Sequence, residues 1–329
     1  MKTGEDKLIQ RIAKAAAFKS GRRLALGIGD DAALFIPRAG FQTILTCDWF
    51  LEGSHFLRDK HPPESIGWKC LARAVSDIAA MGGAPTYFLL SVAIPDTHTG
   101  PWLQRFLTGL GRAARRFHCR LAGGDTTRSD KILMNVTAVG EIRDDRAVPR
   151  SGAKPGDLIY VTGRLGEAEF GLRSLLQSRT AGSLDRICVK KHLYPEPRLA
   201  VGQWLAEKRL ATSMMDLSDG LSSDLPRLCA ASRVGARIIV SKLPEVKLRL
   251  EKNSKDLDLT ELALNGGDDY ELLFTIRPSE VRRLPTKFQG IPLNCIGEIT
   301  RRKRLLLLQP GGREETLSAR GWDPFRKRR

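Results

Sequence analysis

The stretch from residue 32 to residue 46 constrains the fold most, because it leaves no room for a crossover helix. Just before it, the segment 27–32 reads GIGDDA, which fits the dinucleotide-binding pattern G-x-G-x-x-G/A, and Asp48 follows where a ribose-binding acid belongs. A Rossmann unit needs a helix directly after such a loop. Here Pro37 and Gly40 instead interrupt two short apolar strands. We therefore expect no dinucleotide-binding domain.

Helical and strand patterns alternate irregularly along the rest of the chain. The spacing of apolar residues predicts helices over 4–18, 63–82 and 101–117, and strands over 86–95, 119–125 and 132–142. Strands and helices are mixed in the second half as well, without a run of β-α-β units. This order favours an α+β protein of two domains. A polar segment with Pro and Gly, residues 143–157, predicts a boundary between domains 1–145 and 146–329.

Composition excludes several classes of protein. The 329 residues are 42% hydrophobic, and we find no apolar run long enough to cross a bilayer and no signal-peptide core at the start. The six cysteines form no C-x-x-C pair, which favours reduced thiols in the cytoplasm. The net charge of +17 is spread over many segments with few interleaved aromatic residues, so neither a nucleic acid nor a membrane is an expected partner.

Aspartates recur after short apolar strands and small residues. Converging carboxylates would repel one another unless divalent cations separated them, and all-oxygen ligation suits Mg²⁺. Glycines beside them, such as Gly123 and Gly124, would let the backbone approach a phosphate closely. The sequence thus indicates a magnesium and phosphate site built from several such segments: Asp30 and Asp31, Asp48, Asp125, Asp216 and Asp219, and Asp268 and Asp269.

For some single aspartates, a purely structural role is an alternative to metal binding. Asp219 and Gly220 are also typical of a turn that caps the following helix. Asp77 lies one helical turn after Arg73, a spacing that allows an ordinary ion pair. We find no Walker A loop, kinase signature, G-x-S-x-G elbow or H-E-x-x-H motif, and the five histidines are dispersed.

The motifs taken together resemble those of the thiamine-monophosphate kinase family, within the aminoimidazole ribonucleotide synthetase superfamily. They run in order over nearly the whole chain: GIGDDAALF, CDWFLEGSHF, GWKCLARAVSDIAAMGGAP, LAGGDTTRS, RSGAKPGDLIYVTGRLGEA, MDLSDGL and GGDDYELLFT. The resemblance implies an N-terminal domain whose mixed sheet pairs with that of a second subunit, giving a homodimer. It also implies a C-terminal α/β domain, with ATP and several Mg²⁺ ions in a cleft between the two domains.

The same resemblance implies roles for particular residues. Catalytic roles fall to Asp125, Asp216 and Asp219, and ATP contacts to Gly124, Asp125, Arg150 and Ser218. The implied substrate contacts are Asp48, His55, Asp268 and Trp322. The implied magnesium ligands are Asp30, Thr46, Cys47, Asp48, Asp77, Asp125, Asp216 and Asp219.

The implied reaction is direct, in-line transfer of the γ-phosphoryl group of ATP to thiamine monophosphate, giving thiamine diphosphate. The chain departs from the family at three positions: Asp268 stands where Glu is usual, Leu107 where a tyrosine often lies near the nucleotide, and Cys47 where threonine is common. Another phosphoryl-transfer enzyme of the superfamily, resembling aminoimidazole ribonucleotide synthetase or selenophosphate synthetase, is the alternative. A basic nucleic-acid-binding protein is a more distant alternative.

Overall fold

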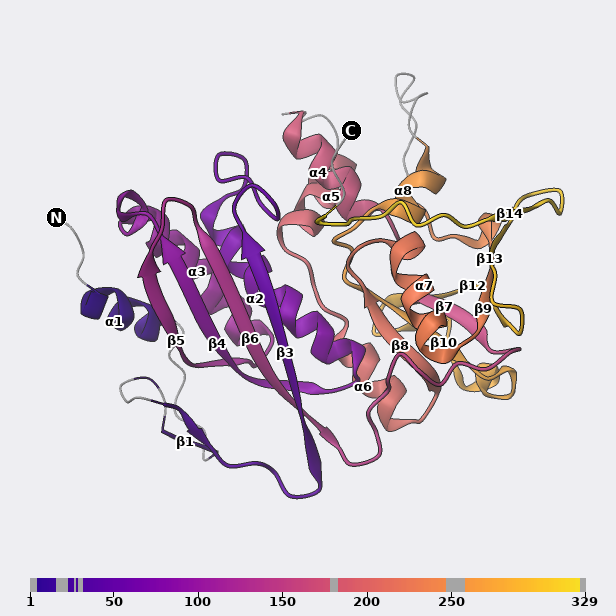
Figure 1. Ribbon diagram of the computed structural model, residues 1–329, viewed down its shortest axis with the longest axis horizontal. Coiled ribbons are helices and arrows are strands. Elements are labelled where there is room, and N and C mark those ends of the chain that lie inside the picture. Colours follow the sequence, from indigo (N-terminus) through magenta and orange to yellow (C-terminus); the bar gives the residue numbers. More distant parts are fainter. Residues whose placement is uncertain are drawn as a thin grey trace. The chain divides into compact units, whose positions relative to one another are not determined.

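The computed structural model describes residues 5–15, 23–26, 28, 32–177, 183–246 and 258–325. The chain divides into two compact units. Unit 1 comprises residues 1–78 and 83–145, and unit 2 comprises residues 79–82 and 146–329. Figure 1 shows the elements of both units, coloured along the sequence.

Unit 1 is built on a mixed sheet with the strand order β3-β6-β4-β5. Strand β6 pairs antiparallel with both β3 and β4, while β5 runs parallel to β4. A separate antiparallel pair, β1 and β2, lies in the same unit. The strands are β1 (Leu24–Leu26), β2 (Leu34–Phe35), β3 (Phe41–Leu51), β4 (Ala84–Ile94), β5 (Arg120–Arg128) and β6 (Leu133–Arg143).

Helices cover one face of the unit 1 sheet. Figure 1 shows α2 (Pro63–Ala80) and α3 (Pro101–Arg116) behind the strands, and α1 (Glu5–Ala15) contacts α3 and β5. Pro101 occupies the first turn of α3, where its missing N–H costs nothing. The buried side chains of Leu71, Phe88 and Phe106 belong to α2, β4 and α3. The predicted helices and strands of this half are therefore present, with ends shifted by a few residues.

The opposite face of this sheet carries exposed apolar side chains. Residues paired directly across neighbouring strands share a face, and the register places Cys47 opposite Thr137 and Thr137 opposite Leu89. Along β3, Leu45 and Trp49 lie on the same face as Cys47 and are 70% and 58% exposed. Unit 1 thus has one face buried by helices and one face open.

Unit 2 contains a larger mixed sheet with the order β14-β13-β9-β12-β7-β10-β8, and β11 pairs with β12. Its strands are β7 (Leu158–Thr162), β8 (Ala211–Leu217), β9 (Gly235–Ile239), β10 (Glu271–Ile276), β11 (Lys287–Phe288), β12 (Ile291–Thr300), β13 (Leu305–Leu308) and β14 (Glu314–Thr316). Every residue of β10 is buried, which explains its unbroken apolar centre, LLF.

The helices of unit 2 pack beside this sheet and on one another: α7 contacts β8 and β9, and α4 contacts α5 and α8. They are α4 (Glu167–Leu176), α5 (Ser183–Leu193), α6 (Leu199–Glu207), α7 (Leu221–Ser232) and α8 (Leu259–Asn265). Mixed sheets with helices in both units confirm the α+β prediction. In the described part of the chain, no helix is both long enough and apolar enough to span a membrane.

Candidate functional site

In unit 1, two predicted magnesium ligands meet between the sheet and a helix. The hydroxyl group of Thr46 on β3 donates a hydrogen bond to the carboxylate of Asp77 on α2. Two residues further along β3, Asp48 points to the same side of the sheet, and its carboxylate lies 3.9 Å from the guanidinium group of Arg73 on α2. Period-two alternation in β3 and helical spacing in α2 thus bring Thr46, Asp48, Asp77 and Arg73 to one side of the sheet.

The other two predicted residues of this region, Cys47 and His55, lie elsewhere. The side chain of Cys47 is on the open face, where its Sγ atom contacts Asn135 and Thr137 at 3.2 and 3.6 Å. A metal held beside Thr46 and Asp77 would therefore meet only the backbone of Cys47. The Nδ1 atom of His55 accepts a hydrogen bond from the backbone N–H of Leu51, the last residue of β3.

Gly124 and Asp125 lie within β5, next to β4. A Cβ atom at Gly124 would come within 1.9 Å of the Leu90 carbonyl oxygen, and its φ of +156° is one that other residues rarely adopt. Asp125 is exposed and pairs in register with Ser91. Backbone contact within the sheet therefore requires glycine at this position, and the approach of a phosphate to it remains a prediction.

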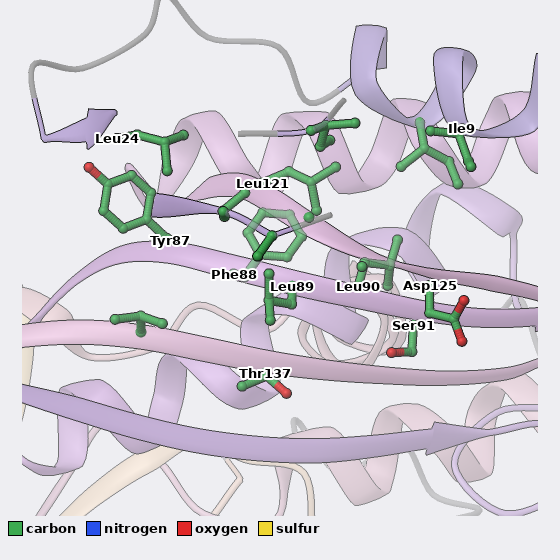
Figure 2. A pocket seen from close by; sticks show the side chains of 18 of the residues that line it. Ile9, Leu24, Tyr87, Phe88, Leu89, Leu90, Ser91, Leu121, Asp125 and Thr137 are labelled. Carbon is green, nitrogen blue, oxygen red and sulfur yellow. The ribbon is translucent and has the colours of Figure 1, made fainter. Parts of the chain in front are cut away.

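A pocket of about 700 Å³ lies beside these residues in unit 1. Figure 2 shows Asp125 and Ser91 at one end and Tyr87 and Leu24 at the other, with aliphatic side chains from β4 and β5 between them. Residues of α1, including Ile9, also line it. Among the described residues that line it, the pocket thus combines an apolar wall with the Asp125 carboxylate, which suits a ligand that has both an apolar ring and a charged part.

The structure does not bring all predicted unit 1 ligands together. Through the strand pairing, Asp48 shares a face with Gly124, whereas Asp125 shares the opposite face with Trp49 and Ser91. Asp30 and Asp31 lie outside the described residues. Within the described ranges, no three His, Cys, Asp or Glu side chains form a group that could hold a metal ion.

Leu107 is a buried residue of α3. Its side chain is 1% exposed and belongs to the core under α3. The leucine that stands in place of tyrosine therefore fills the core of unit 1. It is not among the residues that line the described pocket.

In unit 2, the predicted aspartates flank the end of β8. Asp216 is 4% exposed, and Ser218 and Asp219 follow in the turn that leads to α7. The buried carboxylate of Asp224 accepts hydrogen bonds from the backbone N–H groups of Ser218 and Asp219, at 3.1 and 3.0 Å. Arg227 donates to Asp219 at 2.6 Å and to Asp224 at 2.7 Å.

Asp224 was not among the residues predicted from the sequence. Burial raises its pKa to about 7, with the charge of Asp219 acting in the same direction and the two N–H donors and Arg227 opposing it. Its position in the first turn of α7, in the sequence GLSSD, is the signal in the sequence, because an acidic side chain is favourable near a helix N-terminus. Asp224 therefore fixes the turn that carries Ser218 and Asp219.

Two further predicted residues reach the same turn. The backbone N–H of Asp268 donates to the carbonyl oxygen of Ser218, and that of Trp322 donates to the carbonyl oxygen of Asp219, both at 2.8 Å. A Cβ atom at Gly321 would lie 2.0 Å from the Asp219 carbonyl oxygen, so this close approach requires glycine. Unit 2 thus brings together Asp216, Ser218, Asp219, Asp268 and Trp322, which are far apart in the sequence.

Arg150 lies on the chain segment beside β8. The carbonyl oxygen of Pro149 accepts from the N–H of Met214, and the carbonyl oxygen of Arg150 accepts from the hydroxyl group of Ser232 on α7. The Arg150 side chain is exposed. An exposed guanidinium group in this position is available to a phosphate.

The predicted metal-binding side chains offer carboxylate and hydroxyl oxygens, which are the donors that Mg²⁺ prefers. Thr46 hydrogen-bonded to Asp77, and Asp216 buried at a strand end, are consistent with ligands that are oriented before a cation binds. The residues present therefore fit magnesium rather than a softer metal.

Comparison with known proteins then identifies the family. The model of the AIR synthase related protein N-terminal domain matches residues 29–142, and that of the C-terminal domain matches residues 154–307. The thiamine-monophosphate kinase of Escherichia coli (strain K12) is 39% identical over 99% of this chain and 99% of its own length. The chain belongs to the thiamine-monophosphate kinase family. The Bacillus subtilis (strain 168) member is 36% identical over 92% of this chain and 94% of its own.

Solved structures agree with this membership. The thiamine-monophosphate kinase of Stenotrophomonas maltophilia K279a superposes with a TM-score of 0.81 at 35% identity, covering 93% of this chain and 97% of that one. The structure of AaThiL complexed with AMPPCP and TMP gives 0.78 at 32% identity, covering 97% and 96%. The hydrogenase maturation protein HypE of E. coli, at 19% identity and 0.78, shares the fold. The chain is thus an enzyme of a kinase family.

Proposed function

We propose that this protein transfers the γ-phosphoryl group of ATP to thiamine monophosphate, forming thiamine diphosphate and ADP. The observation that carries the proposal is the nearly full-length identity of 36–39% with thiamine-monophosphate kinases of E. coli and B. subtilis. A related structure, at 32% identity, holds AMPPCP, an ATP analogue, and TMP, thiamine monophosphate. The P–O bond to the ADP leaving group breaks, and a bond forms to a phosphate oxygen of the acceptor.

The acceptor needs little help from a general base. A phosphate monoester has a second pKa of about 6 and is largely ionised at neutral pH. The obstacle is repulsion between two polyanions, so the site must supply positive charge and alignment. This supports direct in-line transfer, with the exposed guanidinium group of Arg150 and the N–H group of Gly124 binding phosphate oxygens of ATP.

We assign magnesium binding to the aspartate-rich segments. The proposed ligands are Asp30, Thr46, the backbone of Cys47, Asp48, Asp77, Asp125, Asp216 and Asp219. Bound Mg²⁺ ions would neutralise phosphate charge during the transfer. In the described structure, Arg73 lies beside Asp48 and Arg227 beside Asp219, so both carboxylates are already paired with cationic groups.

We propose that ATP and thiamine monophosphate contact different sets of residues. The pocket beside Gly124 and Asp125, with its apolar wall, is our candidate for the nucleotide base. Ser218, in the turn after β8, is a separate candidate for an ATP contact. Asp268, Trp322, His55 and Asp48 are the candidates for thiamine monophosphate. A carboxylate repels phosphate, so Asp268 would face the thiamine part, which carries a cationic thiazolium ring and an amino group. The functional domains proposed are residues 1–145 and 146–329.

We also propose that the protein is a cytoplasmic homodimer. Support comes from the open face of the unit 1 sheet, where Leu45 is 70% and Trp49 58% exposed. Large apolar side chains exposed side by side on one strand often mark a contact surface between proteins. All six cysteines are free, which agrees with a reducing compartment.

The proposal is tested with ATP that is labelled in its γ-phosphate. Purified protein, Mg²⁺ and thiamine monophosphate should give thiamine diphosphate with the label in its terminal phosphate, in equal amount to ADP. Thiamine without a phosphate group serves as the control acceptor and should take up no label. Formation of ADP without labelled thiamine diphosphate would contradict the proposed acceptor.

A further inference from the structure

The segment that carries Asp268 has an unusual backbone. Asp268 and Tyr270 have φ angles of +65° and +49°, in the left-handed region that residues other than glycine seldom occupy. Such strain persists only where surrounding contacts hold it, and it concentrates at binding sites. The segment connects α8 with the buried strand β10. Its conformation therefore needs an explanation from its contacts.

Contacts of the backbone and of the Asp269 side chain hold this segment. The backbone N–H groups of Asp268 and Tyr270 donate to the carbonyl oxygens of Ser218 and Leu217, at 2.8 and 2.9 Å. The carboxylate of Asp269 accepts from the backbone N–H groups of Gly166 and Ala168 at the start of α4, at 2.7 and 3.2 Å. The two neighbours of Asp269 are thus fixed to the turn after β8, while Asp269 itself is fixed to a helix N-terminus.

The side chain of Asp268 is held separately. The Tyr270 hydroxyl group donates to Oδ1 of Asp268 at 2.8 Å, and Nδ1 of His192, on α5, lies 3.7 Å from Oδ2. Tyr270 and His192 are each about 2% exposed, whereas the Asp268 side chain is 26% exposed. The buried Tyr270 hydroxyl group is therefore hydrogen-bonded to one oxygen of the Asp268 carboxylate, and the buried His192 ring lies near the other. The carboxylate itself remains partly exposed and accessible to a ligand.

We infer that Tyr270 and His192 are positioning residues that fix the Asp268 carboxylate to receive the thiamine part of the acceptor. The inference rests on the proposed function, in which Asp268 contacts thiamine monophosphate. Neither buried side chain has to touch the substrate in this role. A carboxylate held by a neighbouring donor keeps one orientation, so that binding of the amino group or thiazolium cation does not have to immobilise it.

Kinetics of the full-length enzyme test this inference. Tyr270→Phe removes one hydroxyl group and keeps the ring, and we expect it to raise the KM for thiamine monophosphate about five-fold or more while the KM for ATP changes less than about two-fold. His192→Leu should act in the same direction. His192→Asn, which keeps a nitrogen near the position of Nδ1, should restore much of the loss.

A double-mutant cycle separates positioning from general stability. Asp268→Asn combined with Tyr270→Phe should lose no more affinity for thiamine monophosphate than Asp268→Asn alone, because both changes act on the same carboxylate. Melting temperatures identify variants that fail to fold. Additive losses, or equal increases in KM for both substrates, would overturn the inference. A wild-type enzyme that forms no thiamine diphosphate would overturn the proposed function, and with it this inference.

Discussion

The hydroxyl group of Thr46, on strand β3, donates a hydrogen bond to the carboxylate of Asp77, on helix α2. This bond joins two proposed magnesium ligands from different elements of unit 1. An ion bound there would meet a carboxylate whose orientation is already set, which is how supporting contacts tune metal sites.

Thr46→Val removes the donor while keeping the shape of the side chain. We expect the activity at limiting Mg²⁺ to fall by about ten-fold to a hundred-fold, with the Mg²⁺ concentration for half-maximal activity raised. Thr46→Ser should retain most activity. The matched control is Thr43→Val, at an exposed position of the same strand. Equal magnesium requirements in Thr46→Val and wild type would contradict the assignment.

Glu271 and Arg198 form a buried ion pair in unit 2, and Glu271 also accepts from Thr162. Glu271→Gln would leave the Arg198 guanidinium group buried without its counterion, so we expect the free energy of unfolding to fall by about 3 kcal/mol. Urea denaturation measures the change. Glu280→Gln removes the partner of the exposed Arg283 and should cost less than about 1 kcal/mol.

The same pair predicts a pH dependence. Burial acts to raise the pKa of Glu271, but the charge and hydrogen bonds of Arg198 outweigh it and hold the pKa below the usual 4.5. A carboxyl group with a lowered pKa in the folded state stabilises the protein above its unfolded pKa, and this contribution disappears as the pH falls. The stability difference between wild type and Glu271→Gln should therefore be largest above pH 4.5 and shrink in more acidic solution. A difference that grows on acidification would be inconsistent with the pair.

Gly124 should tolerate no side chain. Its Cβ atom would collide with the Leu90 carbonyl oxygen at 1.9 Å, so Gly124→Ala must separate β5 from β4. We expect a loss of more than about 2 kcal/mol in unfolding free energy, together with a higher KM for ATP. Gly100→Ala is the control, because nothing lies within 4 Å of a Cβ atom at Gly100. Wild-type stability of Gly124→Ala would show that β5 is placed differently.

The open sheet face predicts the assembly state. Leu45→Glu puts a charge at a side chain that is 70% exposed in a single chain, and we expect it to convert the proposed dimer to a monomer in analytical ultracentrifugation. Ile187→Glu, at a 53% exposed isoleucine on α5, should leave the assembly unchanged. A wild-type protein that sediments as a monomer would refute the dimer.

Local sequence patterns predicted the helices and strands of unit 1, but Asp48 and Asp125, expected directly after their strands, lie inside β3 and β5 because both strands continue beyond them. Pro101 and the apolar spacing after it predicted the helix that became α3, and the absence of a crossover helix before β3 correctly excluded a Rossmann start. The same periodicities also carry information about the site. Alternation along β3 already separates the side chain of Cys47 from those of Thr46 and Asp48, and helical spacing in α3 puts Leu107 in the core.

Other relationships depend on pairing between distant segments, and no local spacing reveals them. The face on which Asp125 lies follows from the register of β5 against β4, which shifts between Phe88 and Leu89. The contact of Asp268 with His192 requires the packing of α5 beside the segment before β10. Only the folded chain shows which carboxylates are oriented by buried neighbours.

The most direct test of the central claim is the initial rate of thiamine diphosphate formation from ATP and thiamine monophosphate, for wild type, Asp125→Asn and Asp130→Asn. Asp130 is an exposed aspartate shortly after β5 and provides the matched control. We predict magnesium-dependent product from wild type and Asp130→Asn, and a rate near zero for folded Asp125→Asn. Undiminished product from Asp125→Asn would contradict the proposed site, and absence of product from wild type would contradict the proposed reaction.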